Sequence, residues 1–472
     1  MSQIQVIHWF RQDLRLVDNP ALDAAARAGT VLPIFILDTK NSGDHAMGAA
    51  SRVWCHHALQ SLSESLQDRL AIYQGDPMAI LQQLCQQHDI QAVFWNRCYE
   101  PWRIQRDQVI KSELKAQEIS VNTYNGSLLW EPWQVKKQDG THYKVFTPYY
   151  RKGCLVAEPP RFPLGSPESL ITLTKPKDSL TIDALRLCPQ HDWHVDLIKS
   201  WEISEQGGQN RLSAFVRDHI NDYKQGRDIP SLQSTSRLSP YLHHGLISPN
   251  QAWYAARQSG DSSSVDVFCS ELGWREFSYS QLYYNPTIAT ENLQTKFDQF
   301  PWLDDKAVLR AWQQGQTGIP MVDAGMRELY QTGYMHNRVR MIVGSFLVKN
   351  CLLHWHHGER WFWDCLFDAD YASNSASWQW IAGCGADAAP FFRIFNPVTQ
   401  GQKFDPEGTY IKQYCPELIN MPIKQLHAPW EAKPEILQQA GIELGVDYPL
   451  PVVDLKISRQ RALDAFKSLK KE

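Results

Sequence analysis

The first 130 residues alternate short apolar runs with longer segments whose apolar positions recur every three to four residues. The short runs predict strands at Val6–Trp9, Val31–Leu37, Leu70–Tyr73, Ala92–Trp95 and Val121–Tyr124. The periodic segments between them predict helices at Pro20–Ala28, Ala50–Leu66 and Pro77–Gln87. Strands and helices that alternate at this spacing predict an α/β domain with a parallel sheet and flanking helices over residues 1–130. No G-x-G-x-x-G follows the first strand, so an ordinary dinucleotide site there is not supported.

The pattern changes twice after residue 130. Residues 131–200 contain many helix breakers, with four prolines in the segment 158–167, and we expect a long connector on the surface. From residue 201 to 472 the helical period dominates, which predicts a larger all-α domain. The clearest helical segments are Asn210–Tyr223, Ser263–Tyr284, Asp304–Gln314, Pro320–Thr332, Asn337–Leu353 and Leu455–Glu472.

Composition narrows the class of protein. The formal net charge is −4, so contact with a nucleic acid would need a local basic patch. The sequence contains no run of about 18 apolar residues, so we expect no membrane span. The N-terminus does not resemble a signal peptide. The ten cysteines form no C-x-x-C pair or regular framework, which favours reduced thiols and a cytoplasmic location. Tryptophan is abundant, with 18 residues, and core packing explains most of them.

One predicted helix, Ser263–Tyr284, places unusual residue types on a single face. Glu271, Trp274 and Arg275 stand at i, i+3 and i+4, followed by Ser278 at i+7. A carboxylate, an indole, a guanidinium and a hydroxyl together suit a polar pocket with an aromatic wall. The alternative is an intrahelical Glu271–Arg275 pair beside an ordinary core tryptophan.

The segment Gly318–Lys349 is richer in candidates. Asn337, Arg340 and Met341 fall on one helix face, while Arg338 is rotated by roughly 100° from Asn337. The first face could contact a bound ligand, while the Arg338 side chain reaches a different surface. The simpler interpretation is a solvated pair of arginines at the end of a helix.

A third segment, Asp368–Trp380, puts Asn374 and Trp378 on one face and turns Trp380 to the other side. Its Asp-x-Asp pattern lacks the ligands of a calcium loop. The hydroxyls of Thr235–Ser239, with Arg237, suit a pyrophosphate, as does the nearby Tyr223–Asp228 segment. The paired histidines show no metal-ligand spacing, so we expect no metal.

Together these segments closely resemble the DNA photolyase/cryptochrome family. The segments that carry the resemblance occur in the family's order from end to end: Trp9–Arg15, Thr235–Ser239, Glu271–Phe277, Gly318–Lys349, Asp368–Trp380 and Asp387–Pro397. The resemblance implies an α/β domain, a connector and a helical domain that binds FAD. The implied FAD contacts are Tyr223, Thr235, Ser236, Arg237, Leu238, Ser239, Glu271, Arg275, Asn337, Arg340, Asp368, Asp370 and Asn374, with Asn374 beside the flavin N5.

The resemblance also assigns a substrate and a reaction. It implies that blue light drives electron transfer from reduced FAD to a cyclobutane pyrimidine dimer flipped out of damaged DNA. The implied lesion pocket consists of Glu271, Trp274, Asn337, Met341 and Trp380, and Arg338 and Arg393 would contact DNA phosphates. Trp378, Trp355 and Trp302 match the family's chain of tryptophans that carries an electron to the flavin.

Details of the same segments favour one branch of the family. Photolyases of (6-4) products carry histidine where this chain has Asn337 and Met341, and plant cryptochromes carry aspartate where it has Asn374. The region after Tyr99 departs from the folate site of enterobacterial photolyases, because Trp102 and Arg103 replace an Asn-Glu pair. The segments Gly48–Arg52 and Tyr124–Leu129 instead resemble the subgroup close to plant cryptochromes, whose repair members bind methenyltetrahydrofolate in a different way. The resemblance therefore implies an antenna chromophore, 5,10-methenyltetrahydrofolate, whose residues we do not assign. A blue-light receptor cryptochrome, including the single-strand-preferring branch, and a dark flavin oxidoreductase are the alternatives. We expect a monomer with no obligate protein partner.

Overall fold

The computed structural model describes residues 4–388 and 392–469. The chain forms two compact units that interleave along the sequence. Unit 1 comprises residues 1–221, 236–286 and 367–372, and unit 2 comprises residues 222–235, 287–366 and 373–472. The expected division of the chain at residues 130 and 200 stays a prediction.

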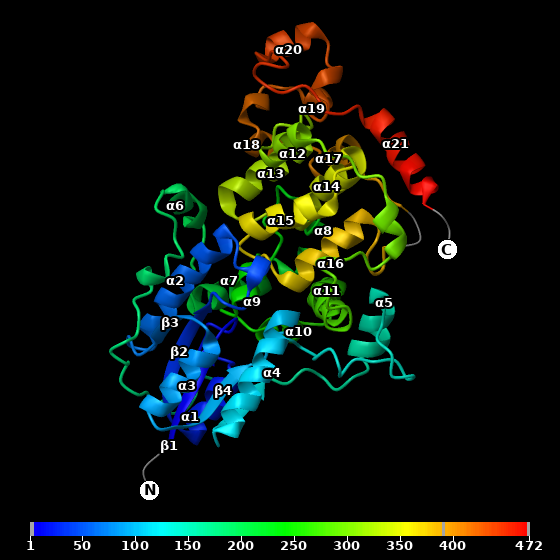
Figure 1. The fold of residues 1–472 in the computed structure, drawn as a ribbon. Helices are drawn as coiled ribbons and strands as arrows, with labels where there is room; N and C mark the ends of the chain where they lie inside the picture. The colour runs from blue at the N-terminus through cyan, green and yellow to red at the C-terminus, as the bar shows by residue number, and fades with distance from the viewer. Residues whose placement is uncertain (1–3, 389–391, 470–472) are drawn as a thin grey trace. The chain divides into compact units, whose positions relative to one another are not determined.

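A five-stranded parallel sheet is the centre of unit 1 (Figure 1). Its strands follow the order β3-β2-β1-β4-β5, and every neighbouring pair is parallel. The bounds are β1 (Ile4–Phe10), β2 (Gly29–Asp38), β3 (Ala71–Gly75), β4 (Ile90–Asn96) and β5 (Ser120–Tyr124). All five predicted strands are therefore confirmed.

Helices cover this sheet and bury its apolar side chains. The helices that connect the strands are α1 (Pro20–Ala28), α2 (Ala49–Ser65), α3 (Pro77–Gln87) and α4 (Pro101–Ala116). Helix α1 packs against β1, β2 and β4, and α3 packs against β3 and β4. Trp9 and Trp95, on neighbouring strands, meet edge to face at 5.7 Å in the sheet's core. The predicted parallel α/β domain is confirmed.

The connector is attached to the sheet by main-chain hydrogen bonds. Val31 on β2 pairs with residues 171–173, where its N–H donates to the Ile171 oxygen and its oxygen accepts from the Leu173 N–H, both at 2.8 Å. Leu180 N–H donates to the Ile72 oxygen on β3 at 2.8 Å. The connector therefore satisfies main-chain groups of the sheet, in addition to lying on the surface.

The remaining helices confirm the helical second half. Those of unit 1 are α5 (Phe146–Pro148), α6 (Trp193–Ile198), α7 (Glu205–Asp218), α9 (Ser239–His244), α10 (Pro249–Gln258) and α11 (Ser263–Tyr284). Those wholly in unit 2 are α8 (Tyr223–Gly226), α12 (Lys306–Gln313), α13 (Pro320–Thr332), α14 (Asn337–Ser345), α15 (Trp355–Cys365), α17 (Pro397–Phe404), α18 (Thr409–Tyr414), α19 (Ile423–Leu426), α20 (Pro434–Ala440) and α21 (Leu455–Ser468). Helix α16 (Tyr371–Ala382) begins in unit 1 and continues in unit 2.

Local sequence signals set the ends of the helices that carry candidate residues. The Ser262 hydroxyl accepts from the Val265 N–H at the start of α11, which ends just before Pro286. Helix α13 begins at Pro320 and ends at Thr332, and the next residue, Gly333, has a φ of 63°, which suits a residue without a Cβ. Both helices have the predicted bounds.

Two predicted helices end well before the expected residue. Helix α14 ends at Ser345 and passes into a π-helical turn at Phe346–Asn350, whereas the sequence predicted one helix to Leu353. The helix predicted over Asn210–Tyr223 ends at Asp218 as α7, and α8 begins after a short turn.

Candidate functional site

Asp370 is the most strongly perturbed carboxylate of unit 1. The Tyr279 hydroxyl on α11 donates a hydrogen bond to Asp370 Oδ2, and His243 Nδ1 on α9 lies 3.9 Å from the same oxygen. Burial alone would raise the pKa of Asp370, but the interactions with His243, Arg275 and Tyr279 outweigh it and hold that pKa below its ordinary value. Unit 1 therefore presents a buried, ionised carboxylate at this position.

Arg275 supplies the neighbouring positive charge. Its guanidinium donates to the Ser127 oxygen at 2.8 Å and to Glu276 Oε1 at 3.1 Å, and lies 4.9 Å over the Tyr279 ring. Burial tends to lower the pKa of Arg275, but Tyr279, Glu276 and Asp370 raise it above its ordinary value. The sequence allowed a simple Glu271–Arg275 pair, and the structure shows that Arg275 pairs with Glu276.

Glu276 fastens the loop that precedes the connector to α11. Its carboxylate accepts from the N–H groups of Leu129 and Trp130, at 2.9 and 3.2 Å. Burial raises the pKa of Glu276 to about 7, against the lowering effect of Arg275 and these two N–H groups. Arg275 and Glu276 thus hold residues 127–130 against α11 by hydrogen bonds to main-chain groups.

A tight turn at Ser236–Ser239 precedes α9. Arg237 has φ +51°, and the Leu238 N–H lies 3.4 Å from the Ser236 hydroxyl oxygen. Arg211 Nε donates to the Ser236 oxygen at 3.0 Å, and the Arg237 guanidinium lies 4.2 Å over the Trp201 ring. Left-handed residues in such turns point successive N–H groups to one side, an arrangement that binds anions. This turn therefore fits the pyrophosphate expected here.

Trp274 is held by an aromatic partner. Phe146 on α5 stacks on the indole with a centroid distance of 3.7 Å and an interplanar angle of 11°. Trp274 and Glu271, one helical turn earlier, are both half-buried on α11. Stacking fixes the indole plane, as an aromatic wall requires.

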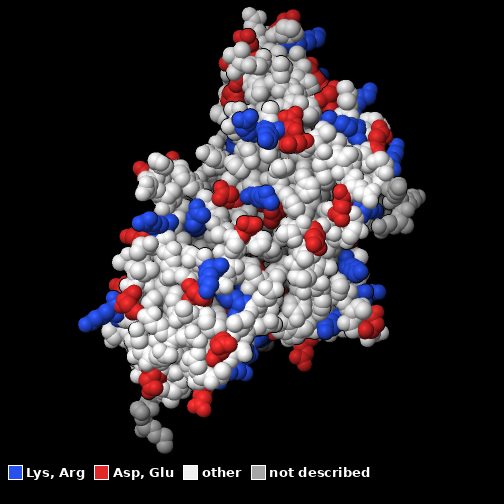
Figure 2. Space-filling view, in the orientation of Figure 1, with Lys and Arg blue, Asp and Glu red and all other residues white. Residues whose placement is uncertain are grey.

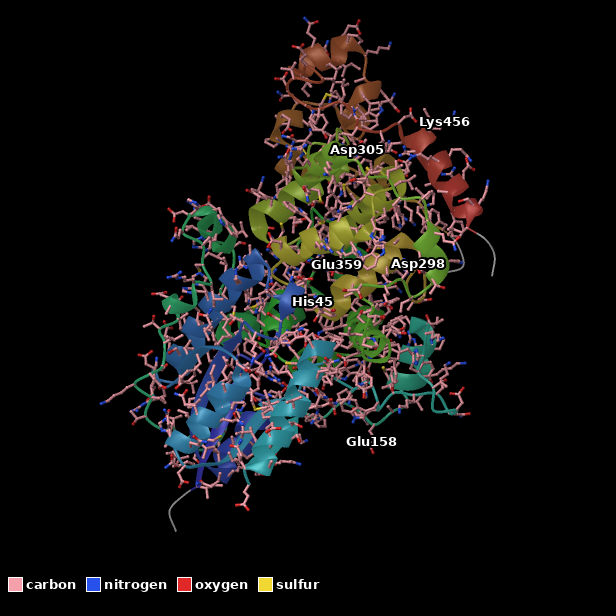
Figure 3. The ribbon with its side chains drawn as sticks, in the orientation of Figure 1. His45, Glu158, Asp298, Asp305, Glu359 and Lys456 are labelled. Carbon is pink, nitrogen blue, oxygen red and sulfur yellow. The ribbon has the colours of Figure 1, made fainter. Side chains whose placement is uncertain are left out.

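In unit 2, Asn374 is hydrogen-bonded to α15. Its Nδ2 donates to the main-chain oxygen of Glu359 at 3.0 Å and lies 3.4 Å from Glu359 Oε1 (Glu359 is labelled in Figure 3). The Ser375 hydroxyl lies 3.3 Å from the same carboxylate oxygen. Burial raises the pKa of Glu359 to about 7. The Asn374 amide is thereby oriented, and its Oδ1 remains an acceptor for a ligand.

The three candidate electron carriers lie around α15. The Trp378 ring packs directly on the backbone at Gly358, where an added Cβ would stand 2.1 Å from Trp378 Cη2. Trp355, one turn earlier on α15, is fully buried and donates from Nε1 to Asn292 Oδ1 at 3.0 Å. The His354 ring lies 5.6 Å from Trp355 and 5.1 Å from Trp302. Trp378 and Trp355 are buried, whereas Trp302 is half-buried.

The start of α14 carries Asn337, Arg338, Arg340 and Met341. Asn337 is exposed, and Arg340 Nε donates to the Met335 oxygen at 2.7 Å. Arg338 forms an ion pair with Asp228 at 2.9 Å and lies 3.7 Å from Met341 Sδ. The contact with Met341 arises because residues at i and i+3 are neighbours on a helix, and the expected orientation of Arg338 toward another surface stays a prediction.

The remaining candidates occupy separate positions. Tyr223 is buried at the start of α8, Thr235 is half-buried, and Asp368 is buried beside α16. Trp380 donates from Nε1 to the Asp387 oxygen at 3.2 Å, and Arg393 is exposed. Of the segment Asp387–Pro397, residues 389–391 lie outside the described residues.

Comparisons with known proteins decide the family. Residues 6–167 match the family model of DNA photolyase, and residues 268–468 match the FAD binding domain of DNA photolyase. The deoxyribodipyrimidine photo-lyase of Agrobacterium fabrum is 43% identical over 477 residues, which cover 99% of this chain and 98% of the relative. The chain belongs to the DNA photolyase/cryptochrome family.

Solved structures of this family have the same fold. The crystal structure of a bacterial class III photolyase from Agrobacterium tumefaciens matches with a TM-score of 0.95 and 42% identity, covering 100% of this chain and 99% of that chain. A cryptochrome of Synechocystis matches with a TM-score of 0.89 and 29% identity, covering 98% and 99%. Cryptochrome-2 of Arabidopsis thaliana is 37% identical over 97% of this chain and 78% of its own length. The expected resemblance and fold class are thus confirmed.

Several residues around these sites were not predicted. Reasoning from spacing missed Tyr279, Glu359 and Gly358, and considered His243 only as a weak metal candidate. Within the described ranges, no group of three or more His, Cys, Asp or Glu side chains could hold a metal ion. A membrane-crossing helix is likewise not found among the described residues. Each missed residue acts on a partner far away in the sequence, so no local motif could have revealed it.

Proposed function

We propose that this photolyase-family chain repairs cyclobutane pyrimidine dimers in DNA with blue light. The observation that carries the proposal is the full-length, 43% identical relative named deoxyribodipyrimidine photo-lyase. FAD, when bound, reduced and excited, would supply the electron that splits the dimer and would take it back afterwards. As an enzyme it would be a carbon–carbon lyase.

FAD would be held by the residues that the family resemblance assigned. In unit 1 these are Ser236, Arg237, Leu238, Ser239, Glu271, Arg275, Asp368 and Asp370, and in unit 2 they are Tyr223, Thr235, Asn337, Arg340 and Asn374. The donor set fits the group, because the turn at Arg237 suits a pyrophosphate and the ionised Asp370 suits an N–H or O–H donor. Asn374, oriented by Glu359, would hydrogen-bond at the flavin N5.

The dimer would enter a pocket after leaving the base stack. Trp274 and Trp380 would act as its stacking walls, which contribute roughly 1–3 kcal/mol per base at aromatic platforms. Glu271 would hydrogen-bond the carbonyl edge of the dimer, beside Asn337 and Met341. Arg338 and Arg393 would bind DNA phosphates, and Arg338 would have to exchange Asp228 for a phosphate to do so.

Trp378, Trp355 and Trp302 would carry an electron inward from solvent to reduce the flavin before repair. The half-buried position of Trp302, against the buried Trp355 and Trp378, supports this direction. Close packing also supports it, because Gly358 lets the Trp378 ring touch the backbone of the helix that begins with Trp355.

An antenna chromophore, 5,10-methenyltetrahydrofolate, remains part of the proposal, and its binding residues are unassigned. Trp102, which departs from the enterobacterial folate site, is packed between the guanidinium groups of Arg103 and Arg106, at 4.9 and 5.1 Å. An absorption spectrum of the purified protein tests this point: a near-ultraviolet band beyond those of flavin supports an antenna, and its absence contradicts one. The cytoplasmic location and the monomeric state also stay predictions.

A repair assay tests the main proposal. The reduced protein is irradiated with blue light in the presence of a thymine-dimer oligonucleotide, and dimer loss is measured by chromatography. Light-dependent loss supports a photolyase, and no loss contradicts it. The second candidate, a cryptochrome, is favoured by relatives such as Arabidopsis cryptochrome-2, and repair confined to single strands would identify the single-strand-preferring branch. Turnover of a substrate in the dark would instead identify a flavin oxidoreductase.

A further inference from the structure

Four aromatic rings form a continuous row at the end of α11 in unit 1. Trp133 lies 5.5 Å from Tyr283, which lies 5.2 Å from Tyr284, which stacks on His142 at 4.6 Å with an interplanar angle of 8°. Trp133 and Tyr283 are 39% and 37% exposed, so these large rings are not explained as core residues. The Tyr284 hydroxyl donates to the Pro132 oxygen at 3.2 Å, which ties the helix end to the loop.

The same loop concentrates positive charge. Residues 133–152 contain five basic residues and one acidic residue, although the whole chain has a net charge of −4. In Figure 2, Lys and Arg side chains gather over the part of unit 1 that Figure 1 labels α5. The next carboxylate along the chain, Glu158, points outward from the ribbon in Figure 3.

Two of these lysines stand beside the aromatic row. Lys144 follows His142 by two residues, and the Lys137 main chain is hydrogen-bonded to Thr141, the residue before His142. Burial lowers the pKa of His142, and the charges of Lys144 and Lys137 lower it further. Both lysines are exposed, and neither forms an ion pair with any described residue. The Arg97 guanidinium lies 5.9 Å over the Trp133 ring and is paired with Glu131 at 2.7 Å.

The loop holds these side chains in a fixed arrangement. Gly140, at φ +80°, closes a turn in which the Lys137 N–H donates to the Thr141 oxygen at 2.9 Å. The Asp139 carboxylate accepts from the N–H and the hydroxyl of Thr141, at 2.9 and 2.6 Å. The acidic residue of the loop is thereby engaged locally, and the lysines face solvent.

We propose that this aromatic–basic surface, made of Trp133, His142, Tyr283, Tyr284, Lys137 and Lys144, binds single-stranded DNA beside the lesion. The proposal rests on the proposed DNA repair function. Exposed rings interleaved with lysines are the chemistry of single-strand sites, where bases stack on aromatic faces and ammonium groups neutralise phosphates. An acidic protein partner would account for the lysines, but it would leave the row of exposed aromatic rings unexplained.

The helix geometry predicts how far from the dimer this contact lies. Trp274, the proposed lesion wall, and Tyr284 are both on α11, ten residues apart. At 1.5 Å per residue the separation is about 15 Å, which corresponds to about four nucleotides at 3.4 Å each. Oligonucleotides that extend less than four nucleotides from the dimer would therefore not reach the surface.

The test compares two single-stranded oligonucleotides that carry a central thymine dimer, one of 6 and one of about 16 nucleotides. The holoprotein should bind the longer one more tightly. We expect Lys137→Ala/Lys144→Ala to lose about fivefold of that gain and to lower the salt slope by about 1.4, which is 0.7 per phosphate contact. Trp133→Ala/Tyr283→Ala should lose about tenfold, and Trp133→Phe/Tyr283→Phe should restore most of it.

The controls separate this inference from the proposed function. Lys115→Ala/Lys177→Ala removes two exposed lysines of unit 1 elsewhere and should leave the length dependence unchanged. Light-driven repair of the 6-nucleotide substrate should be unaltered in every variant. Unchanged length dependence in the surface variants, or a loss confined to duplex DNA, would overturn the inference. Failure of the unmodified protein to repair either substrate would instead overturn the proposed function.

Discussion

The buried ammonium group of Lys349 donates a hydrogen bond to the main-chain oxygen of Arg393 at 3.0 Å and lies 3.9 Å over the Phe392 ring. Burial lowers the pKa of Lys349 to about 7. The lysine stands in the π-helical turn after α14, and it holds the main chain from which the exposed Arg393 side chain projects. Burying a charged group costs free energy unless a polar group is hydrogen-bonded to it, and the Arg393 main-chain oxygen is such a partner. We infer that this contact positions Arg393.

Lys349→Met should therefore weaken DNA binding by about as much as Arg393→Ala, while repair per bound dimer stays unchanged. The variant should fold, because replacing a buried charge by an apolar side chain of similar size is often neutral or stabilising. Binding titrations of both single variants and the double variant check this. Additive losses in the double variant would contradict a role that acts through Arg393.

Trp378→Phe should slow photoreduction of oxidised flavin while pre-reduced enzyme keeps its repair yield. Phenylalanine keeps an aromatic ring at this position but is far harder to oxidise than tryptophan. Flash-photolysis of the oxidised protein measures the first quantity and dimer loss under anaerobic, pre-reduced conditions measures the second. Equal losses in the two assays would remove Trp378 from the electron chain.

Gly358→Ala tests the same contact from its other side. The new Cβ would stand 2.1 Å from Trp378 Cη2, so the indole or the helix must move. We expect a loss of about 1–3 kcal/mol in the free energy of unfolding, typical of overpacking in a core, together with slower photoreduction. A variant with unchanged stability and photoreduction would show that Trp378 moves without consequence.

The sequence predicted the architecture well because strand and helix periods are local properties. The bounds of α11 and α13 follow from Ser262, Pro320 and Gly333, each a strong start or stop signal. The π-helical turn at Phe346–Asn350 was not predictable, since its apolar residues fit the helical period equally well. Hydrophobic spacing does not distinguish between the two hydrogen-bond patterns.

The candidate site was predictable only where a motif carried it. Asp370 and Asn374 were found by resemblance, but their partners were not. Tyr279 and Asp370 are 91 residues apart in sequence, and their hydrogen bond appears only when α11 and the start of α16 are brought together. Arg338 was assigned to DNA by the resemblance, and its ion pair with Asp228 was invisible for the same reason.

Glu359 should make stability depend on pH in a defined direction. Its pKa is raised to about 7 in the folded state from an ordinary value of 4.5, so the folded protein binds more protons between these values. Stability contributed by the protonated carboxyl is complete below about pH 4.5 and is lost as pH rises through about 7. Glu359→Gln should flatten this part of the stability profile, and denaturant unfolding at pH 5, 6 and 7 checks the difference. Parallel profiles for variant and unmodified protein would contradict the raised pKa.

Arg338→Ala and Asp228→Asn should shift DNA binding in opposite directions. The alanine variant removes a proposed phosphate contact, so affinity should fall and the salt slope should decrease by about one unit. The asparagine variant removes the carboxylate that now pairs with Arg338, which frees the guanidinium for DNA, so affinity should rise severalfold at low salt. In the Arg338→Ala background the Asp228→Asn change should have a smaller effect, because only general repulsion of phosphates by Asp228 remains. Fluorescence anisotropy over a salt series measures all four proteins. An unchanged slope in Arg338→Ala would exclude Arg338 from the phosphate contacts and leave its ion pair with Asp228 as a purely structural link between α14 and the segment after α8.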